Sequence, residues 1–325
     1  MINKTMLPPL LVALSLTTAH AYTEVGLHPS SSYTASGAAM GNAVASLPAH
    51  PSNIWINPGG LAYQKGVLFY GAPHDEATGF DEEVRDRIFM TSYAGLGGGT
   101  MGAAFLLRQQ PEQSFSRDGA AVPVDINEPA FLLSYGRMAV GKLGVGISLI
   151  GYQHRADDEA LDGDVAFGAT AGVLYRTEYL HKGRTPIDLR CGLSVANAGP
   201  RFDLGEGEAD MPLTLRSGFS ARWEKERGTE ITGAADLYVL YRDLGGGSDF
   251  DRWGGGVGVE ARMNGVVAVR AGYRWDDDFQ PDDWTYGFGV GNEVYEHLGG
   301  ALEYAHSPGE GGFADHIGVR LYWIP

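Results

Sequence analysis

The sequence predicts an all-β protein: a transmembrane antiparallel β-barrel of about fourteen strands, with an N-terminal plug segment in its lumen. Three observations lead to this prediction. Apolar and polar residues alternate over many short segments, the connections between segments are long and short in turn, and no apolar run after residue 21 is long enough for a membrane-spanning helix. The 48 glycines are spread evenly over the 325 residues, which disfavours helix throughout the chain.

The first 21 residues are expected to be an export signal. Lys4 supplies a positive charge, residues 7–16 form a short apolar run, and Ala19-His20-Ala21 matches a small-x-small cleavage site. The apolar run is shorter than the about 20 residues that a membrane-spanning helix needs. The mature chain is therefore expected to be either soluble outside the cytoplasm or a barrel in the outer membrane.

Residues 22–65 precede the first expected strand and are predicted to plug the lumen, because strand side chains alone cannot fill a barrel of about fourteen strands. Residues 35–46 (ASGAAMGNAVAS) are expected to form a short, slim helix. In NIWINPGGLAYQ (53–64), the proline fixes φ, the paired glycines permit close backbone approach, and the asparagines can satisfy backbone groups. The plug residues expected in the lumen are Trp55, Asn57, Pro58, Gly59 and Gly60.

The strands of the barrel, residues 66–325, follow from a period of two. In LTLRSGFSARWE (213–224), leucines and aromatic residues share one face, and Arg216 and Arg222 share the other. Because every backbone N–H and C=O must be paired in hydrocarbon, such strands close into a ring, with apolar faces toward lipid and polar faces toward the lumen. The expected strands lie near 66–74, 87–96, 99–108, 129–138, 142–153, 164–176, 187–197, 213–224, 230–242, 253–263, 266–276, 284–294, 297–306 and 315–324.

The connections indicate the orientation of the barrel. Those after odd-numbered strands are longer and acidic, whereas those after even-numbered strands are mostly short. Long outer loops and short periplasmic turns are typical of outer-membrane barrels. A soluble β-sandwich or propeller is the alternative, but it would rarely place arginines on one face of so many strands. The predicted location is the outer membrane, with its lipid around the barrel.

An Asn-Gly turn at 264–265 makes a local prediction. A two-residue hairpin would pair Met263 with Val266 and turn Arg270 toward lipid, which costs about 2–4 kcal/mol at the midplane. We therefore expect a three-residue or bulged turn that pairs Met263 with Val267 and keeps Arg270 in the lumen.

Charged side chains are expected to line the lumen. Such charges usually pair with each other or with a plug, so a structural ladder that holds the plug is one interpretation. The functional alternative is a binding or translocation path for an anionic amphiphile, whose carboxylate would meet the arginines. The expected inward arginines are Arg190, Arg216, Arg222, Arg270, Arg274 and Arg320, accompanied by Asp188, Asp236, Glu260 and Glu303.

Several classes of function are disfavoured. The net charge of −16 is unsuited to binding nucleic acid, so no such partner is expected. The single cysteine, Cys191, excludes an intrachain disulfide and is expected at the lipid face. No HxxxH or HExxH spacing occurs, so neither a metal site nor a cofactor is expected. Ser148, Ser194 and His306 are the candidates for a lipid hydrolase, but no catalytic motif joins them, and the protein is expected not to be an enzyme.

Three groups of residues carry a resemblance to a known family. They are AMG (39–41) followed by NPGGLA (57–62); LSVANAGPRF (193–202) followed by MPLTLRSGFS (211–220); and AVRAGYRW (268–275) followed by LEYAHSP (302–308) and HIGVRLYW (316–323). In these residues the chain resembles the PorV/PorQ-type outer-membrane proteins, relatives of the FadL transporters, although Gly59 stands where alanine is usual. The resemblance implies a barrel of this size with an N-terminal plug.

The sequence is compatible with two functions. The resemblance implies a non-enzymatic PorV/PorQ-type barrel associated with protein secretion or surface attachment of the type IX kind, with secretion-system or secreted proteins as partners. The alternative is a FadL-like channel for the uptake of hydrophobic or amphiphilic small molecules, with a hydrophobic ligand. A channel would need a hydrophobic pocket near the outer rim and a wall kink or movable plug, whereas secretion would need an interaction surface on the loops.

Overall fold

The computed structural model describes most of the chain from Tyr33 onward. The expected export signal (1–21) and residues 22–32 of the expected plug lie outside the described residues. The described ranges are 33–77, 83–117, 120–158, 163–179, 187–203, 208–209, 211–225, 228–243, 249–276, 283–295, 297–309 and 312–325.

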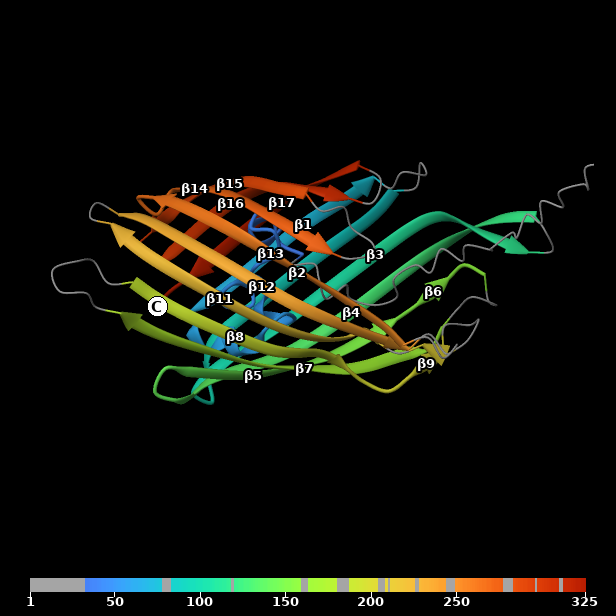
Figure 1. The fold of residues 1–325 in the computed structure, drawn as a ribbon, viewed down its shortest axis with the longest axis horizontal. Coiled ribbons are helices and arrows are strands. Elements are labelled where there is room, and N and C mark those ends of the chain that lie inside the picture. Colours follow the sequence, from blue (N-terminus) through green and yellow to red (C-terminus); the bar gives the residue numbers. More distant parts are fainter. Residues whose placement is uncertain are drawn as a thin grey trace, which may run out of the picture.

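Fourteen long strands form a closed antiparallel barrel, as expected (Figure 1). Each long strand pairs with its neighbours in sequence, and the first pairs with the last to close the ring. The long strands are β1 (Val67–Ala77), β2 (Glu83–Leu96), β3 (Gly99–Arg117), β4 (Ala120–Val140), β5 (Leu143–Gln153), β7 (Val165–Tyr179), β8 (Ile187–Ala198), β11 (Leu213–Lys225), β12 (Thr229–Asp243), β13 (Asp249–Met263), β14 (Val267–Asp276), β15 (Asp283–Tyr295), β16 (Leu298–Gly309) and β17 (Gly312–Trp323). Short strands complete the set: β6 (Arg155–Ala156) on β4, and β9 (Phe202–Asp203) on β10 (Glu208–Ala209).

Strands β3 and β4 are much longer than expected and extend furthest at the end opposite the C-terminus (Figure 1). Residues 109–127, of which 109–117 are mostly polar, were expected to form a loop. Instead residues 109–117 and 120–127 continue the hairpin, because backbone pairing needs no apolar face once a strand has left the lipid. The register shifts between Gln110 and Gln113, where Pro111 has no N–H to donate.

Side chains alternate between the two faces of the wall. Leu237 is 55% exposed on the outer face, while its neighbours Asp236 and Tyr238 are buried in the lumen. Cys191 is exposed on the outer face, as expected. The outer face carries exposed leucine, valine and aromatic side chains on strand after strand, an area of apolar surface that only lipid could cover over so wide a wall.

The turn after β13 confirms the local prediction. Met263 pairs with Val267, and the Val266 N–H donates to the Met263 carbonyl at 3.0 Å. Residues 264 and 265 have φ of 53° and 69°, which asparagine and glycine tolerate. Arg270 therefore faces the lumen, opposite Glu260 on β13.

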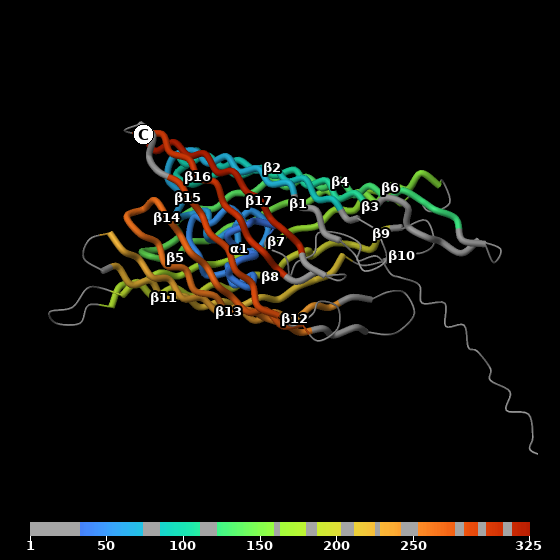
Figure 2. Tube along the Cα trace, turned by 90° about the horizontal axis from the view of Figure 1, so that it is seen from above, coloured from blue at the N-terminus to red at the C-terminus, as the bar shows by residue number. Residues whose placement is uncertain are grey.

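The described N-terminal segment, 33–66, lies inside the ring of strands (Figure 2). It contains α1 (Ala35–Ala38) and the 3₁₀ helices η1 (Pro51–Ile54) and η2 (Pro58–Tyr63). Among the described residues, no helix has the length and apolarity to cross a bilayer. We refer to residues 33–66 as the plug.

The expected helix over 35–46 is wrong beyond Ala38. Gly41 and Asn42 have φ of 63° and 62°, which end helical geometry. At Gly41 the chain passes so close to β14 that a Cβ atom would lie 2.6 Å from the Tyr273 carbonyl oxygen. A longer helix would be too wide for this position.

Candidate functional site

The lumen wall has two chemically different halves. On β1 to β7 the inward side chains are mostly apolar, and they form one cluster with Tyr33, Ile54 and Trp55 of the plug. On β8 to β17 the inward side chains include most of the charged residues. This asymmetry was not predicted, because every inward face was expected to be polar. The apolar wall residues include Tyr70, Ile88, Met90, Leu106, Leu132, Ile150 and Tyr152.

Glycines in the wall form a seat for the second half of the plug. A Cβ atom on Gly172 would lie 2.1 Å from the Asn57 Oδ1, and one on Gly146 would lie 2.3 Å from the Pro58 carbonyl oxygen. A Cβ atom on Gly136 of β4 would lie 2.6 Å from the same Pro58 oxygen. The backbone of η2 can reach the wall only because these positions have no side chain. Part of the high glycine content thus serves the contact between plug and wall.

Asn57 makes hydrogen bonds both within the plug and to the wall. It is fully buried, and its Nδ2 donates to the Ala45 carbonyl at 2.6 Å and to the Val173 carbonyl of β7 at 3.0 Å. Its Oδ1 accepts from the Gly59 N–H at 3.2 Å, which caps η2. The side chain therefore joins both halves of the plug to the wall.

The other expected plug residues also lie in the lumen. Trp55 is 6% exposed, and its ring stands edge-on to Tyr33 at a centroid distance of 5.6 Å. Pro58 starts η2, and Gly59 and Gly60 are buried within it. A Cβ on Gly60 would collide with the Asn53 side chain, so this glycine is needed for packing inside the plug.

Wall side chains hold the plug by hydrogen bonds on several sides. Asp236 of β12 accepts from the Val44 and Ala45 N–H groups at 2.9 and 2.8 Å. Ser134 and Ser148 both donate to the Ile54 carbonyl. Similar bonds involve Tyr70 with Ala35, Thr285 with Ala39 and Gly41, Arg216 with Asn42, and Ser220 with Ser46.

The expected lumen arginines all lie on inner faces, and Arg190, Arg222, Arg270 and Arg320 border one polar space, whereas Arg216 and Arg274 do not. Arg216 contacts the plug and also Asp236 at 3.5 Å, whereas Arg190 pairs with Asp188 at 2.7 Å. Arg222 pairs with Glu230 at 2.5 Å, and Arg274 is buried on β14. Arg270 pairs with Glu260 at 2.7 Å and with Glu303 at 3.3 Å.

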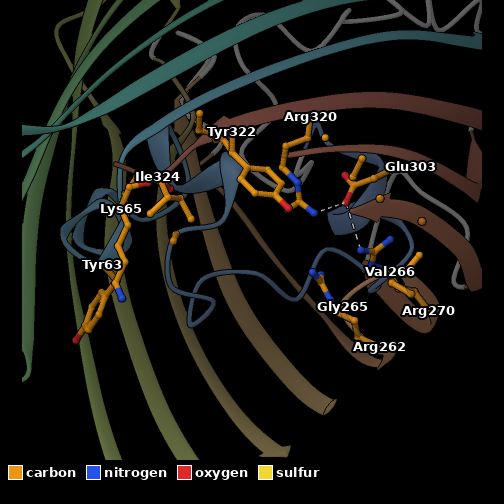
Figure 3. Close-up of a pocket in the computed structure, with 18 residues that line it drawn as sticks. Tyr63, Lys65, Arg262, Gly265, Val266, Arg270, Glu303, Arg320, Tyr322 and Ile324 are labelled. Atoms are coloured by element: carbon orange, nitrogen blue, oxygen red, sulfur yellow. Dashed lines mark hydrogen bonds and ion pairs between the residues drawn. The ribbon is translucent and has the colours of Figure 1, made fainter. Parts of the chain in front are cut away.

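Two polar cavities lie between the plug and the charged half of the wall. The first, about 300 Å³, lies at the short-turn end of the barrel and is lined by Lys65, Arg320 and Tyr322 among others (Figure 3). The second, about 210 Å³, lies beside plug residues 47–50 and reaches Arg190 and Arg222. Both are lined by Ala49, Arg262, Arg270 and Arg320, so they are parts of one polar space. Arg262 is a lining residue that the sequence analysis missed.

His50 of the plug lines the second cavity. Burial lowers the pKa of His50 to about 4, against the opposing attraction of Glu303. Its Nδ1 accepts from the Ser52 N–H at 3.3 Å, so the Nε2–H is left to donate to Ser36 Oγ at 3.2 Å. The neutral imidazole therefore suits its partners.

At the long-loop end, the apolar half of the lumen is filled from the β8–β11 connection. Phe202 is buried with its ring edge-on to Tyr152 at 5.9 Å, and Met211 packs in the same cluster. Beside them, the buried Glu128 accepts from Tyr152 and lies 3.0 Å from His154 Nδ1. Alternation did not mark Phe202 and Met211, because both lie outside the alternating segments; they belong to the resemblance motifs, which do not show that the two side chains enter the lumen.

The structure does not assemble a hydrolase from the three candidate residues. Ser148 is bonded to the plug carbonyl of Ile54. His306 lies across the ring on β16, where its Nδ1 is 2.8 Å from Asp315. Within the described part of the chain, no three His, Cys, Asp or Glu side chains converge as a metal site would require.

Comparison with known proteins gives a likeness of fold. No protein-family model and no curated protein sequence matches the chain. Among solved structures, the Ralstonia pickettii toluene transporter TbuX is similar at 13% identity with a TM-score of 0.55, over 90% of this chain and 98% of that one. The chain has the fold of the FadL-type outer-membrane channels.

Two other structures agree with this. The CymD monoaromatic hydrocarbon channel covers 93% of this chain and 97% of its own at 13% identity and a TM-score of 0.53. A Pseudomonas aeruginosa FadL homologue is similar at 10% identity with a TM-score of 0.53. The match covers 90% of this chain and 98% of the homologue. The barrel is an outer-membrane barrel. Its likeness to the FadL-type structures is one of fold, and nothing in that likeness is specific to PorV/PorQ proteins.

Proposed function

We propose that this protein is an outer-membrane channel for the uptake of small hydrophobic molecules, with residues 33–66 as a movable plug. The observation that carries the proposal is the single apolar cluster that joins the inner face of β1 to β7 with Tyr33, Ile54 and Trp55. Such a wall offers an apolar solute a path along one side of the lumen. The fold of hydrocarbon channels supports the same class of solute.

An incoming solute would first meet Phe202 and Met211. The Phe202 ring occupies the apolar half of the lumen against Tyr152, so an aromatic solute of similar size would replace it with similar ring contacts. Beyond this point the plug fills the lumen. Its polar attachments to the wall are hydrogen bonds at separate points, so it can shift without opening the ring of strands.

Uptake of radiolabelled toluene tests the proposal in cells whose outer membrane otherwise has no such channel. Cells that produce the protein should take up toluene several-fold faster than cells without it. Phe202→Ala should increase the rate further, because it removes the ring that fills the path. Phe219→Ala is the matched control, since Phe219 is 48% exposed on the lipid face and should change nothing. Equal uptake with and without the protein would refute the channel.

A role in secretion is the second candidate, and its support is the motif residues in the plug. In the fold these residues already have a packing role: Gly41 lies against β14, and Asn57 to Gly60 fit the glycine seat. Their presence therefore needs no protein partner. Purification from outer membranes with intact complexes distinguishes the two, since secretion components would be recovered only under the second role.

A further inference from the structure

We propose that the polar space beside the plug is a binding site for a small oxyanion, a carboxylate or a phosphate. It is formed by the two cavities that share Arg262, Arg270 and Arg320. Figure 3 shows the first of them. Lys65 is exposed at its mouth, at the short-turn end that faces the periplasm in outer-membrane barrels. The site lies on the charged half of the wall, away from the apolar path, and does not depend on that path being used.

The charges that line this space do not cancel. Six basic residues line the two cavities, against three glutamates, Glu230, Glu260 and Glu303. Asp188 and Glu224, which pair with Arg190 and Arg222 from outside the cavities, still leave the positive charges in excess by one. In a chain of net charge −16, this local excess attracts an anion strongly, because water screens charges poorly inside the lumen. The basic lining residues are Lys65, Arg190, Arg222, Arg262, Arg270 and Arg320.

The arginines share their acidic partners, so some of their N–H groups have no carboxylate to donate to. Glu260 serves both Arg262 at 3.1 Å and Arg270 at 2.7 Å. Glu303 serves both Arg270 at 3.3 Å and Arg320 at 3.4 Å. Each guanidinium has five N–H donors, so two shared carboxylates cannot satisfy three of them.

Two of the remaining donors are buried, and both belong to side chains that line the cavity. Among the described residues, Arg270 Nη1 and Arg320 Nε have no hydrogen-bond partner, and the Arg270 side chain is only 1% exposed. A Cβ on the cavity residue Gly289 would lie 3.1 Å from Arg270 Nη1, so this nitrogen borders the space that a side chain there would fill. A buried donor without a hydrogen-bond partner costs folding free energy. A bound oxyanion can accept from both of these nitrogens and remove that cost.

Glu303 interacts with Ser36 of the plug, and both of its arginine contacts are made by Oε1, so Oε2 is not bonded to a wall arginine. It accepts only, so a ligand that carries a proton, such as hydrogen phosphate, can donate to it while accepting from the arginines. We therefore expect phosphate to bind more tightly than a simple carboxylate.

The competing explanation is that these arginines only anchor the plug. The hydrogen bonds that hold the plug come from other wall residues, among them Asp236, Ser134 and Arg216. Arg262, Arg270 and Arg320 pair with glutamates of the wall instead. Anchoring therefore does not explain why they surround a cavity.

Titration calorimetry on the purified full-length protein in detergent tests the site with two probes, inorganic phosphate and benzoate, against chloride at equal ionic strength. We expect saturable binding of phosphate or of both probes. Arg320→Gln leaves Glu303 paired with Arg270 and should weaken binding about tenfold or more. Arg137→Gln, an exposed arginine near the short-turn end of β4, should leave binding within about twofold of wild type.

The outcomes separate the source of the anion from the existence of the site. Tighter binding of phosphate supports a phosphate ligand, and tighter binding of benzoate supports an organic acid. No saturable binding of either probe by the wild-type protein overturns the proposal, as does equal weakening by Arg320→Gln and Arg137→Gln. If Arg320→Gln does not fold, Lys65→Gln at the mouth replaces it, with a smaller loss of affinity expected.

Discussion

Single residues decide how closely the plug approaches the wall. At Gly172 of β7, the Asn57 side chain of the plug lies directly against the wall backbone. The same side chain donates hydrogen bonds to Val173 of β7 and to Ala45. The sequence analysis selected Asn57 and Gly59 from their local conformational roles. It could not find Gly172 or Gly146, because a strand glycine gives no sign of what approaches it from a distant part of the chain.

Gly172→Ala should therefore loosen the plug. The added methyl would lie 2.1 Å from Asn57 Oδ1, and we expect a loss of about 1–3 kcal/mol of folding free energy together with faster proteolysis of the plug. Thermal unfolding and limited proteolysis measure the two effects. Gly233→Ala is the matched control, because a Cβ there meets nothing within 4 Å, and it should behave like the wild-type protein. Equal behaviour of the two variants would contradict the glycine seat.

At the scale of elements, the strands were predictable and the plug only in part. Alternation marks a strand reliably when lipid covers one face and an enclosed lumen the other, so all fourteen strands were placed. The outer ends of β3 and β4 were missed, because beyond the lipid the alternation is lost while the pairing continues. The helix expected over 35–46 ended at Ala38, because the neighbouring wall required a turn at Gly41.

The first 3₁₀ element, η1, should respond to pH through His50, its N-cap residue. Burial lowers the pKa of His50 to about 4 from its ordinary value near 6.5, so the unfolded chain binds the proton more readily than the folded one. The plug's stability is then complete above about pH 6.5 and declines as the pH falls toward 4. The charged groups that face His50 are Glu303, Arg320, Arg270 and Glu260.

Limited proteolysis of the plug across pH 7 to 4 measures this effect. We expect cleavage to become faster as the pH falls, and His50→Gln should remove the part of the pH dependence that arises between pH 6.5 and 4. An unchanged profile in His50→Gln would assign the pH dependence to other groups.

In the whole molecule, the lumen wall is divided into an apolar half on β1 to β7 and a charged half on β8 to β17. Alternation shows which side chains point inward, but it cannot show which inward faces will be apolar. Ile88 and Met90 lie on the inner face of β2, which was expected to be polar, and they belong to the apolar cluster. The arginines of β8 to β17 were expected to line the lumen, but their grouping around a cavity depends on the curvature of the closed ring. An apolar path on one side and an anion site on the other are therefore properties of the assembled barrel.

In the proposed channel the plug must move before a solute can pass, and a reversible tether between plug and wall shows whether it does. Ser46→Cys with Ser220→Cys, in a Cys191→Ala background, puts one thiol on the plug and one on β11, next to the point where the Ser220 hydroxyl donates to the Ser46 backbone carbonyl at 3.2 Å. Disulfide formation is checked by mass spectrometry, and toluene uptake is measured before and after reduction. We predict that the oxidised protein takes up no toluene and that reduction restores uptake. Equal uptake in the two states, with the disulfide formed, would contradict the account.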